Sequence, residues 1–203
     1  MLRIDETSKT LVAPQAGGLV TEASPDRDEL LALVGASWEA FAEELGLPSL
    51  KLLATEPFPG VDMLAFDADT GRVVVVQISG AGDAERLLRA LDAAAAVASW
   101  DAARLASVHE ALSAAVPGDS PRIVLVAGGG YDEGPLATAE WLVRRHGVEL
   151  SAYSVNTYRF GSERLLSVRR EFPPREGAQG DPATAMQHML ASLPGHSAPP
   201  PGA

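Results

Sequence analysis

The order of predicted helices and strands favours an α/β or α+β domain built on a mixed β-sheet. Apolar residues recur at helical spacing over residues 30–45 and within the alanine-rich stretch 84–116. Short apolar runs, which are typical of buried strands, stand between and after these stretches. The resulting order is a helix, a meander of strands, a long helix, a strand, a helix and two final strands. Interleaving of this kind predicts a sheet that is flanked by helices.

The N-terminal part is predicted to form a short strand or hairpin over residues 2–13 and then a helix. Ser24-Pro25-Asp26 supplies a helix N-cap, a proline at the first helical position and an acidic first turn. Gly46 is expected to end this helix. Its apolar face is formed by residues three or four positions apart: Leu30, Leu31, Val34, Trp38, Phe41 and Leu45.

Residues 60–80, with the sequence GVDMLAFDADTGRVVVVQISG, predict a β-hairpin whose turn lies at residues 68–71. Asp62 opens the first strand of this hairpin. Gln77 and Ser79 stand one residue apart at the end of the second strand. At this point Asp62 has two interpretations: a carboxylate that binds a metal ion, or a strand residue that simply binds a neighbouring backbone amide.

The remaining elements are again strands and helices. The alanine-rich helical stretch is expected to break near residues 99–101. A helix over residues 136–146 is expected to turn Trp141 and Leu142 inward, and Gly147 should stop it. The other predicted strands cover residues 50–56, 122–128, 148–155 and 164–172.

Residues 173–203 differ in composition from the rest of the chain. They are rich in proline, glycine and alanine, which predicts a flexible tail. A helix of about three turns is not stable alone, so the amphipathic segment at 182–193 either folds back onto its own domain or docks into a partner's groove. The predicted divisions are therefore an N-terminal strand or hairpin extension at 1–19, a domain at 20–172 and this tail. The apolar face of the tail segment comprises Met186, Met189, Leu190 and Leu193.

The composition excludes some functions and disfavours others. Because none of the 203 residues is cysteine, disulfides and thiolate metal sites are excluded, and a cytoplasmic location is expected. No apolar run approaches the roughly 20 residues that span a bilayer, so no membrane association is expected. A net charge of −11 disfavours nucleic-acid binding, which draws on lysine and arginine. The basic cluster around Arg169 and Arg170 is either a charged edge strand or a weak patch for nucleic acid or an acidic partner.

Two segments resemble the PD-(D/E)XK nuclease superfamily, and in particular its small bacterial restriction-endonuclease-like and RecB-like members. They are the hairpin GVDMLAFD…GRVVVVQIS and the later VLVAGGGYDEGPLATAEWL, and the resemblance spans residues 20–172. It implies a single restriction-endonuclease-like α/β domain. It also implies a degenerate catalytic site. Asp62 keeps the first acid, Gln77 replaces the second acid with a weaker neutral ligand, and Ser79 stands where the family has a lysine.

This resemblance leads to three hypotheses about function. The first is a catalytically degenerate protein that acts as a binding or scaffolding component of a bacterial assembly, with a protein partner or a second copy of the chain and without a cofactor. The second is a weakly active nuclease that holds Mg²⁺ through Asp62 and Gln77, with Arg86 or Arg89 reaching in from the following helix to replace the missing lysine. The third is a module that binds nucleic acid without cleaving it.

Overall fold

The computed structural model of the chain describes residues 2–5, 10–12, 19–21, 23–80, 83, 85–160 and 162–174. Residues Met1–Pro173 make one compact unit. The amphipathic helix expected at 182–193, with its methionine and leucine face, lies outside the described residues.

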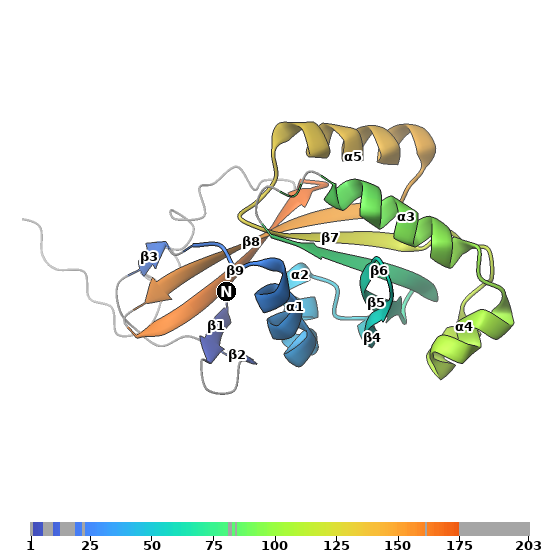
Figure 1. Cartoon of the computed structure of the whole chain (residues 1–203), viewed down its shortest axis with the longest axis horizontal. Coiled ribbons are helices and arrows are strands. Elements are labelled where there is room, and N and C mark those ends of the chain that lie inside the picture. The colour runs from blue at the N-terminus through green and yellow to red at the C-terminus, as the bar shows by residue number, and fades with distance from the viewer. Residues whose placement is uncertain are drawn as a thin grey trace, which may run out of the picture. The chain divides into compact units, whose positions relative to one another are not determined.

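The described strands form one mixed sheet, as the sequence predicts (Figure 1). They run in the spatial order β2-β1-β9-β8-β7-β6-β5-β4, and β3 pairs with β8. β6, β7 and β8 are parallel to one another, whereas the other described pairs are antiparallel. The strands are β1 (Leu2–Asp5), β2 (Thr10–Val12), β3 (Leu19–Thr21), β4 (Leu50–Phe58), β5 (Val61–Asp67), β6 (Arg72–Ser79), β7 (Arg122–Gly128), β8 (Leu150–Phe160) and β9 (Glu163–Phe172).

Helices cover both faces of the sheet (Figure 1). On one face α1 and α2 pack against β5, β6, β7 and β8 through a continuous apolar cluster. On the other face α3 and α5, which form the crossovers between the parallel strands, pack against β7 and β8. The helices are α1 (Arg27–Ala36), α2 (Trp38–Leu45), α3 (Arg86–Ala98), α4 (Ala102–Val108) and α5 (Glu133–His146), with a 3₁₀ helix at Glu110–Ala114.

The central hairpin, β5 and β6, is buried on both faces, and this explains its composition. Every residue of β5 is buried, as are residues 73–79 of β6. Strands covered by helices on both sides read as near-continuous apolar runs, such as the four valines that follow Arg72. Polar residues in this hairpin therefore need an explanation, because burying a polar group is costly unless it finds a partner.

The first helix differs from its prediction at its start and in its middle. Asp26, not Ser24, is the N-cap, and it accepts a hydrogen bond from the Glu29 backbone N–H at 2.8 Å. Pro25 therefore lies outside the helix, and its carbonyl packs against the end of β7. A Cβ on Gly128 would lie 2.5 Å from the Pro25 oxygen. Ser37 then divides the predicted single helix into α1 and α2.

The prediction that Trp141 faces inward is wrong. Its side chain is 53% exposed and packs on the His146 ring, with the ring centroids 4.3 Å apart. The face of α5 that meets the sheet contains Ala139 and Val143, which are four positions apart. Because a helix turns about 100° per residue, Trp141 lies about 200° around the axis from Ala139 and points away from the sheet.

The remaining elements agree with the prediction in kind and differ in extent. The N-terminal hairpin, the break between α3 and α4 and strand β7 are confirmed. β4 continues through Pro57 to Phe58, with an irregularity in its pairing to β5 after Thr55. β8 runs on to residue 160, five residues beyond the predicted end.

Candidate functional site

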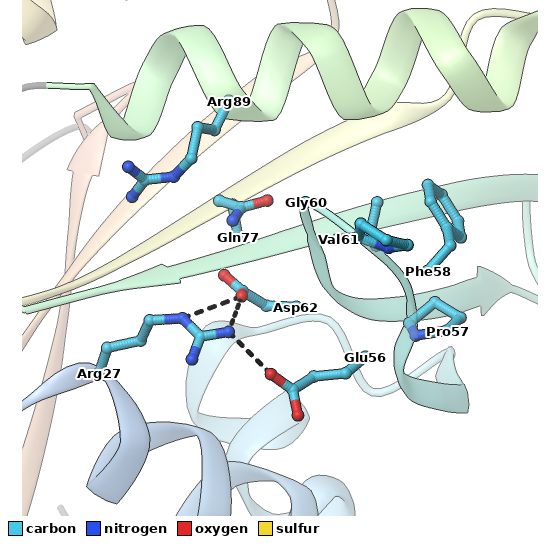
Figure 2. Close-up of a pocket in the computed structure, with 10 residues that line it drawn as sticks. Arg27, Glu56, Pro57, Phe58, Gly60, Val61, Asp62, Gln77 and Arg89 are labelled. Carbon is cyan, nitrogen blue, oxygen red and sulfur yellow. Dashed lines mark hydrogen bonds and ion pairs between the residues drawn. The ribbon is translucent and has the colours of Figure 1, made fainter.

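Asp62 and Gln77 lie side by side where the hairpin meets α1 and α3 (Figure 2). The register of the hairpin pairs Met63 with Val76, so the next residue outward on each strand is Asp62 and Gln77. Both residues are 3% exposed and both line a pocket of about 680 Å³. We call this the Asp62 pocket.

The carboxylate of Asp62 is held by Arg27, which lies 35 positions earlier in the sequence. Oδ1 accepts hydrogen bonds from Arg27 Nε at 3.1 Å and from Arg27 Nη2 at 2.5 Å. Oδ2 accepts the backbone N–H of Ile78 at 2.6 Å. Both oxygens of the buried carboxylate therefore have partners, and its charge is balanced by a guanidinium group.

Arg27 is in place because the start of α1 packs against the ends of β6 and β7. A Cβ on Gly80, just after β6, would lie 3.6 Å from the Arg27 backbone nitrogen, and Gly128 ends β7 against Pro25. Arg27 is the first residue of α1, so its side chain extends from this junction toward Asp62 (Figure 2).

Sequence reasoning missed Arg27, although one signal was available. An arginine in the first turn of a helix opposes the helix dipole, which favours acids there. Arg27 stands among the acids of the segment Asp26-Arg27-Asp28-Glu29 and is the first turn's single base. A residue that violates the local preference is often held by a tertiary contact, and here that contact is Asp62.

Glu56 is a second residue that the sequence did not reveal. Its carboxylate accepts a hydrogen bond from Arg27 Nη2 at 3.0 Å. Glu56 adopts a φ of +48° at the irregularity in β4, directly before Pro57. Such a conformation costs a non-glycine residue on the order of 1 kcal/mol. The backbone strain at Glu56 coincides with a carboxylate aimed at the Arg27–Asp62 pair.

The pKa of Arg27 is raised above its ordinary value. Hydrogen bonding to Asp62 is the largest cause, followed by hydrogen bonding to Glu56. A third carboxylate, Asp28, accepts from Nη1 at 2.7 Å. Arg27 therefore stays charged at any ordinary pH, and its donors are directed at acids on three sides.

Gln77 and Ser79, the other two residues predicted for the site, have different environments. The Gln77 Oε1 atom is buried and has no hydrogen-bond partner among the described residues. Ser79 is 1% exposed and does not line the Asp62 pocket. Its hydroxyl donates to the Val126 carbonyl at 3.4 Å. Gln77 thus lines the pocket and has a buried acceptor without a partner in the described part of the chain, whereas Ser79 is part of the sheet.

Arg86 and Arg89 do not bind Asp62. Arg89 lines the pocket from α3 (Figure 2). Its guanidinium is paired with the Asp83 carboxylate. Arg86 is 4% exposed and donates to the backbone carbonyls of Asp83 and Gly130. It also lies over the Tyr131 ring, 4.7 Å from the centroid. The cation at Asp62 comes from the helix before the hairpin rather than from the helix after it.

The arrangement does not fit a divalent metal ion. Mg²⁺ requires several oxygen ligands in near-octahedral geometry. Both oxygens of Asp62 are engaged, and Arg27 already brings a positive charge to them. In the described part of the chain, no group of three or more histidine, aspartate or glutamate side chains is placed to hold a metal ion. The Arg27 guanidinium group binds Asp62, where the nuclease hypothesis would place Mg²⁺.

The walls of the Asp62 pocket are apolar on one side and charged on the other. Pro57, Phe58 and Val61 supply the apolar side, and Phe58 is fixed by an edge contact with Trp100, with centroids 5.0 Å apart. The charges that line the pocket balance, because Arg27 and Arg89 face Glu56 and Asp62.

The predicted basic patch is divided between two faces of the sheet. Arg169 pairs with Ser154 and Arg170 with Tyr153 in the β8–β9 ladder, so the two arginines point to opposite faces. Arg169 is bound to Glu171, with Nη2 2.7 Å from its carboxylate. Arg170 is half-buried and lines a separate pocket. The two side chains do not form one surface.

Each helix among the described residues is too short or too polar to cross a lipid bilayer. Comparisons of the chain with models of protein families, with curated proteins and with solved structures found no match.

Proposed function

We propose that this chain is a non-cleaving binding protein with a nuclease-like scaffold, in which Arg27 takes the place of a catalytic metal ion. The observation that carries the proposal is the ion pair between Arg27 and the buried Asp62. The αβββαβ order around the central hairpin and the position of Asp62 at its open end also support a relation to the PD-(D/E)XK scaffold.

Electrostatics argues against a metal ion beside Arg27. Charges of +2 and +1 held about 4 Å apart repel each other by about 8 kcal/mol at an effective dielectric constant of about 20. Arginine stays protonated in proteins, so Arg27 cannot escape this repulsion by losing its proton. A metal ion would have to displace the guanidinium from a carboxylate that is 4% exposed.

Among the residues that the structure describes, the Asp62 pocket also lacks an unpaired charged group that could take part in hydrolysis. Attack of water on a phosphate needs a base or metal to activate the water and a cation to stabilise the developing charge. Gln77 is neutral, and the Ser79 hydroxyl binds the Val126 carbonyl. Arg89, the other cation that lines the pocket, is paired with Asp83.

The preferred ligand is a protein segment, from a partner or a second copy of the chain. The apolar wall at Pro57 and Phe58 can bury a side chain, and the Gln77 Oε1 atom can accept one hydrogen bond from it. Nucleic acid is disfavoured because the pocket's charges cancel and the whole chain carries a net charge of −11.

A nuclease assay tests the proposal directly. The full chain would be incubated with single-stranded and double-stranded DNA and RNA in Mg²⁺ or Mn²⁺, beside Asp62→Ala and the control Asp69→Ala in the exposed turn. We expect no metal-dependent cleavage by any of the three proteins. Cleavage by the wild type and by Asp69→Ala, but not by Asp62→Ala, would overturn the proposal in favour of an active nuclease.

Binding assays separate the remaining alternatives. Sedimentation velocity over a range of concentrations would detect self-association of the chain. Fluorescence anisotropy with labelled DNA at several salt concentrations would detect a nucleic-acid module, whose affinity should fall steeply as salt rises. We expect no salt-dependent DNA binding, and tight binding that disappears in Arg27→Ala would contradict the choice of a protein ligand.

A further inference from the structure

A second, smaller pocket lies at the opposite end of the parallel strands, where β7 and β8 begin and β9 ends. Its volume is about 290 Å³, and we call it the Arg170 pocket. The polar groups that line it are Arg122, Ser151, Arg170 and Glu149. It shares no lining residue with the Asp62 pocket.

Three of these side chains come from adjacent strands and point to the same face of the sheet. Val124 is paired with Ser151 in the parallel β7–β8 ladder, and Arg122 lies two residues before Val124. Tyr153 lies two residues after Ser151 and is paired with Arg170 on β9. Because side chains alternate along a strand, Arg122, Ser151 and Arg170 share one face.

The pocket contains donors without acceptors. The Arg170 Nε–H and the Ser151 hydroxyl are both buried and have no hydrogen-bond partner among the described residues. Ser151 is 1% exposed although it lines the pocket. Arg122 forms an ion pair with Asp67, whose Oδ2 lies 3.9 Å from Nη1, a separation that is too long for a hydrogen bond. Buried polar groups in native proteins are almost always satisfied, so donors of this kind indicate a missing acceptor.

The charge of the pocket favours an anion. Arg122 and Arg170 contribute two positive charges to its lining. Asp67, which forms an ion pair with Arg122, does not line the pocket, and the acid at the pocket's edge, Glu149, is already paired with Arg72. A guanidinium group presents planar donors that match the oxygens of phosphate or carboxylate. The volume lies just below the range of about 300–1,000 Å³ that is usual for drug-sized ligands, which indicates a small ligand or a small group of a larger one.

We propose that the Arg170 pocket binds a phosphate group, with Arg122, Ser151 and Arg170 as its donors. The phosphate is either free inorganic phosphate or the phosphate group of a small monoester. In this site the two guanidinium groups neutralise the anion and the Ser151 hydroxyl fixes its orientation. The site is independent of the function proposed for the Asp62 pocket.

Isothermal titration of the full chain with inorganic phosphate at constant ionic strength tests the proposal. We expect saturable binding with one site per chain. Arg170→Met and Arg122→Met should each weaken binding about tenfold or more, because each removes a charge-assisted hydrogen bond. Arg169→Met is the matched control: it removes the neighbouring arginine, which lies on the opposite face and binds Glu171, and should leave the affinity unchanged.

Ser151→Ala keeps the proposal testable if an arginine variant fails to fold. It removes one buried hydroxyl without changing the backbone, so it should weaken phosphate binding several-fold without lowering the melting temperature of the phosphate-free protein. A lower melting temperature together with unchanged binding would show that Ser151 serves the fold alone and would overturn its assigned role.

Two results would overturn the phosphate site. No saturable binding up to about 10 mM phosphate, or an equal loss in Arg169→Met and Arg170→Met, would overturn the site. Glycerol phosphate serves as a second probe. Tighter binding of glycerol phosphate than of inorganic phosphate supports a site for an esterified phosphate, and equal or weaker binding supports a site for the free ion.

Discussion

At the scale of single residues, Arg27 connects acids that are distant in the sequence. Its guanidinium donates to Asp62 at the open end of the hairpin, to Glu56 in β4 and to Asp28 beside it. Arg27 and Asp62 differ in exposure to solvent: the Asp62 side chain is 4% exposed and the Arg27 side chain is 37% exposed. Asp62 is therefore the buried member of the ion pair, and the loss of Arg27 would leave the Asp62 charge buried without a partner.

A double-mutant cycle on Arg27 and Asp62 measures this coupling. Arg27→Met should lower the free energy of unfolding by about 3 kcal/mol, the lower end for breaking a buried ion pair, because part of Arg27 remains in water. Asp62→Leu combined with Arg27→Met should recover much of this loss, since no charge then remains buried. The measurement is denaturant unfolding of the two single variants and the double variant. If the two single losses simply add in the double variant, the residues are not coupled and the site has been misinterpreted.

At the scale of elements, the hairpin is closed by a buried acid at its turn. Asp67 is 4% exposed, and its Oδ1 accepts from the Ser49 hydroxyl at 2.8 Å and from the Asp69 backbone N–H at 3.1 Å. Burial alone would raise the pKa of Asp67, but hydrogen bonds from Ser49, Thr70 and Asp69 outweigh it and lower this pKa. The ionised carboxylate ties the turn of the hairpin to the residue that precedes β4.

This lowered pKa predicts a dependence of stability on pH. A carboxyl group whose pKa is lower in the folded state adds stability above its unfolded pKa, about 3.9, and loses it as the pH falls through the folded value. The wild type should therefore lose stability below about pH 4 more steeply than Asp67→Asn does. Urea unfolding at pH values from 6 down to 2 measures the two slopes, with Asp69→Asn in the exposed part of the turn as the control. Equal slopes in the wild type and Asp67→Asn would show that the turn does not depend on this charge.

At the scale of the whole molecule, the sequence predicted the order of elements better than the contacts between them. The hairpin, the parallel strand β7 and the caps at Gly46 and Gly147 follow from local patterns, because turn residues and apolar runs act over a few positions. The Arg27–Asp62 pair does not, since it joins residues 35 positions apart. The sequence offered Arg86 and Arg89 as cations near the hairpin, and only the packing of α1 against β6 and β7 shows that Arg27 is the arginine bound to Asp62.

That packing predicts the effect of two glycine substitutions. Gly128→Ala would place a methyl group 2.5 Å from the Pro25 carbonyl oxygen, a backbone atom that cannot turn aside. The start of α1 would have to move away from β7, so the variant should lose about 1–3 kcal/mol of stability, the usual cost of overpacking. Gly35→Ala in α1 is the control. Its methyl group would lie 3.6 Å from the Met63 side chain, an ordinary contact, and alanine favours helix over glycine by up to about 1 kcal/mol. Thermal unfolding should therefore place Gly128→Ala below the wild type and Gly35→Ala at or above it. If Gly128→Ala is as stable as the wild type, Arg27 is not positioned by contact between Pro25 and β7.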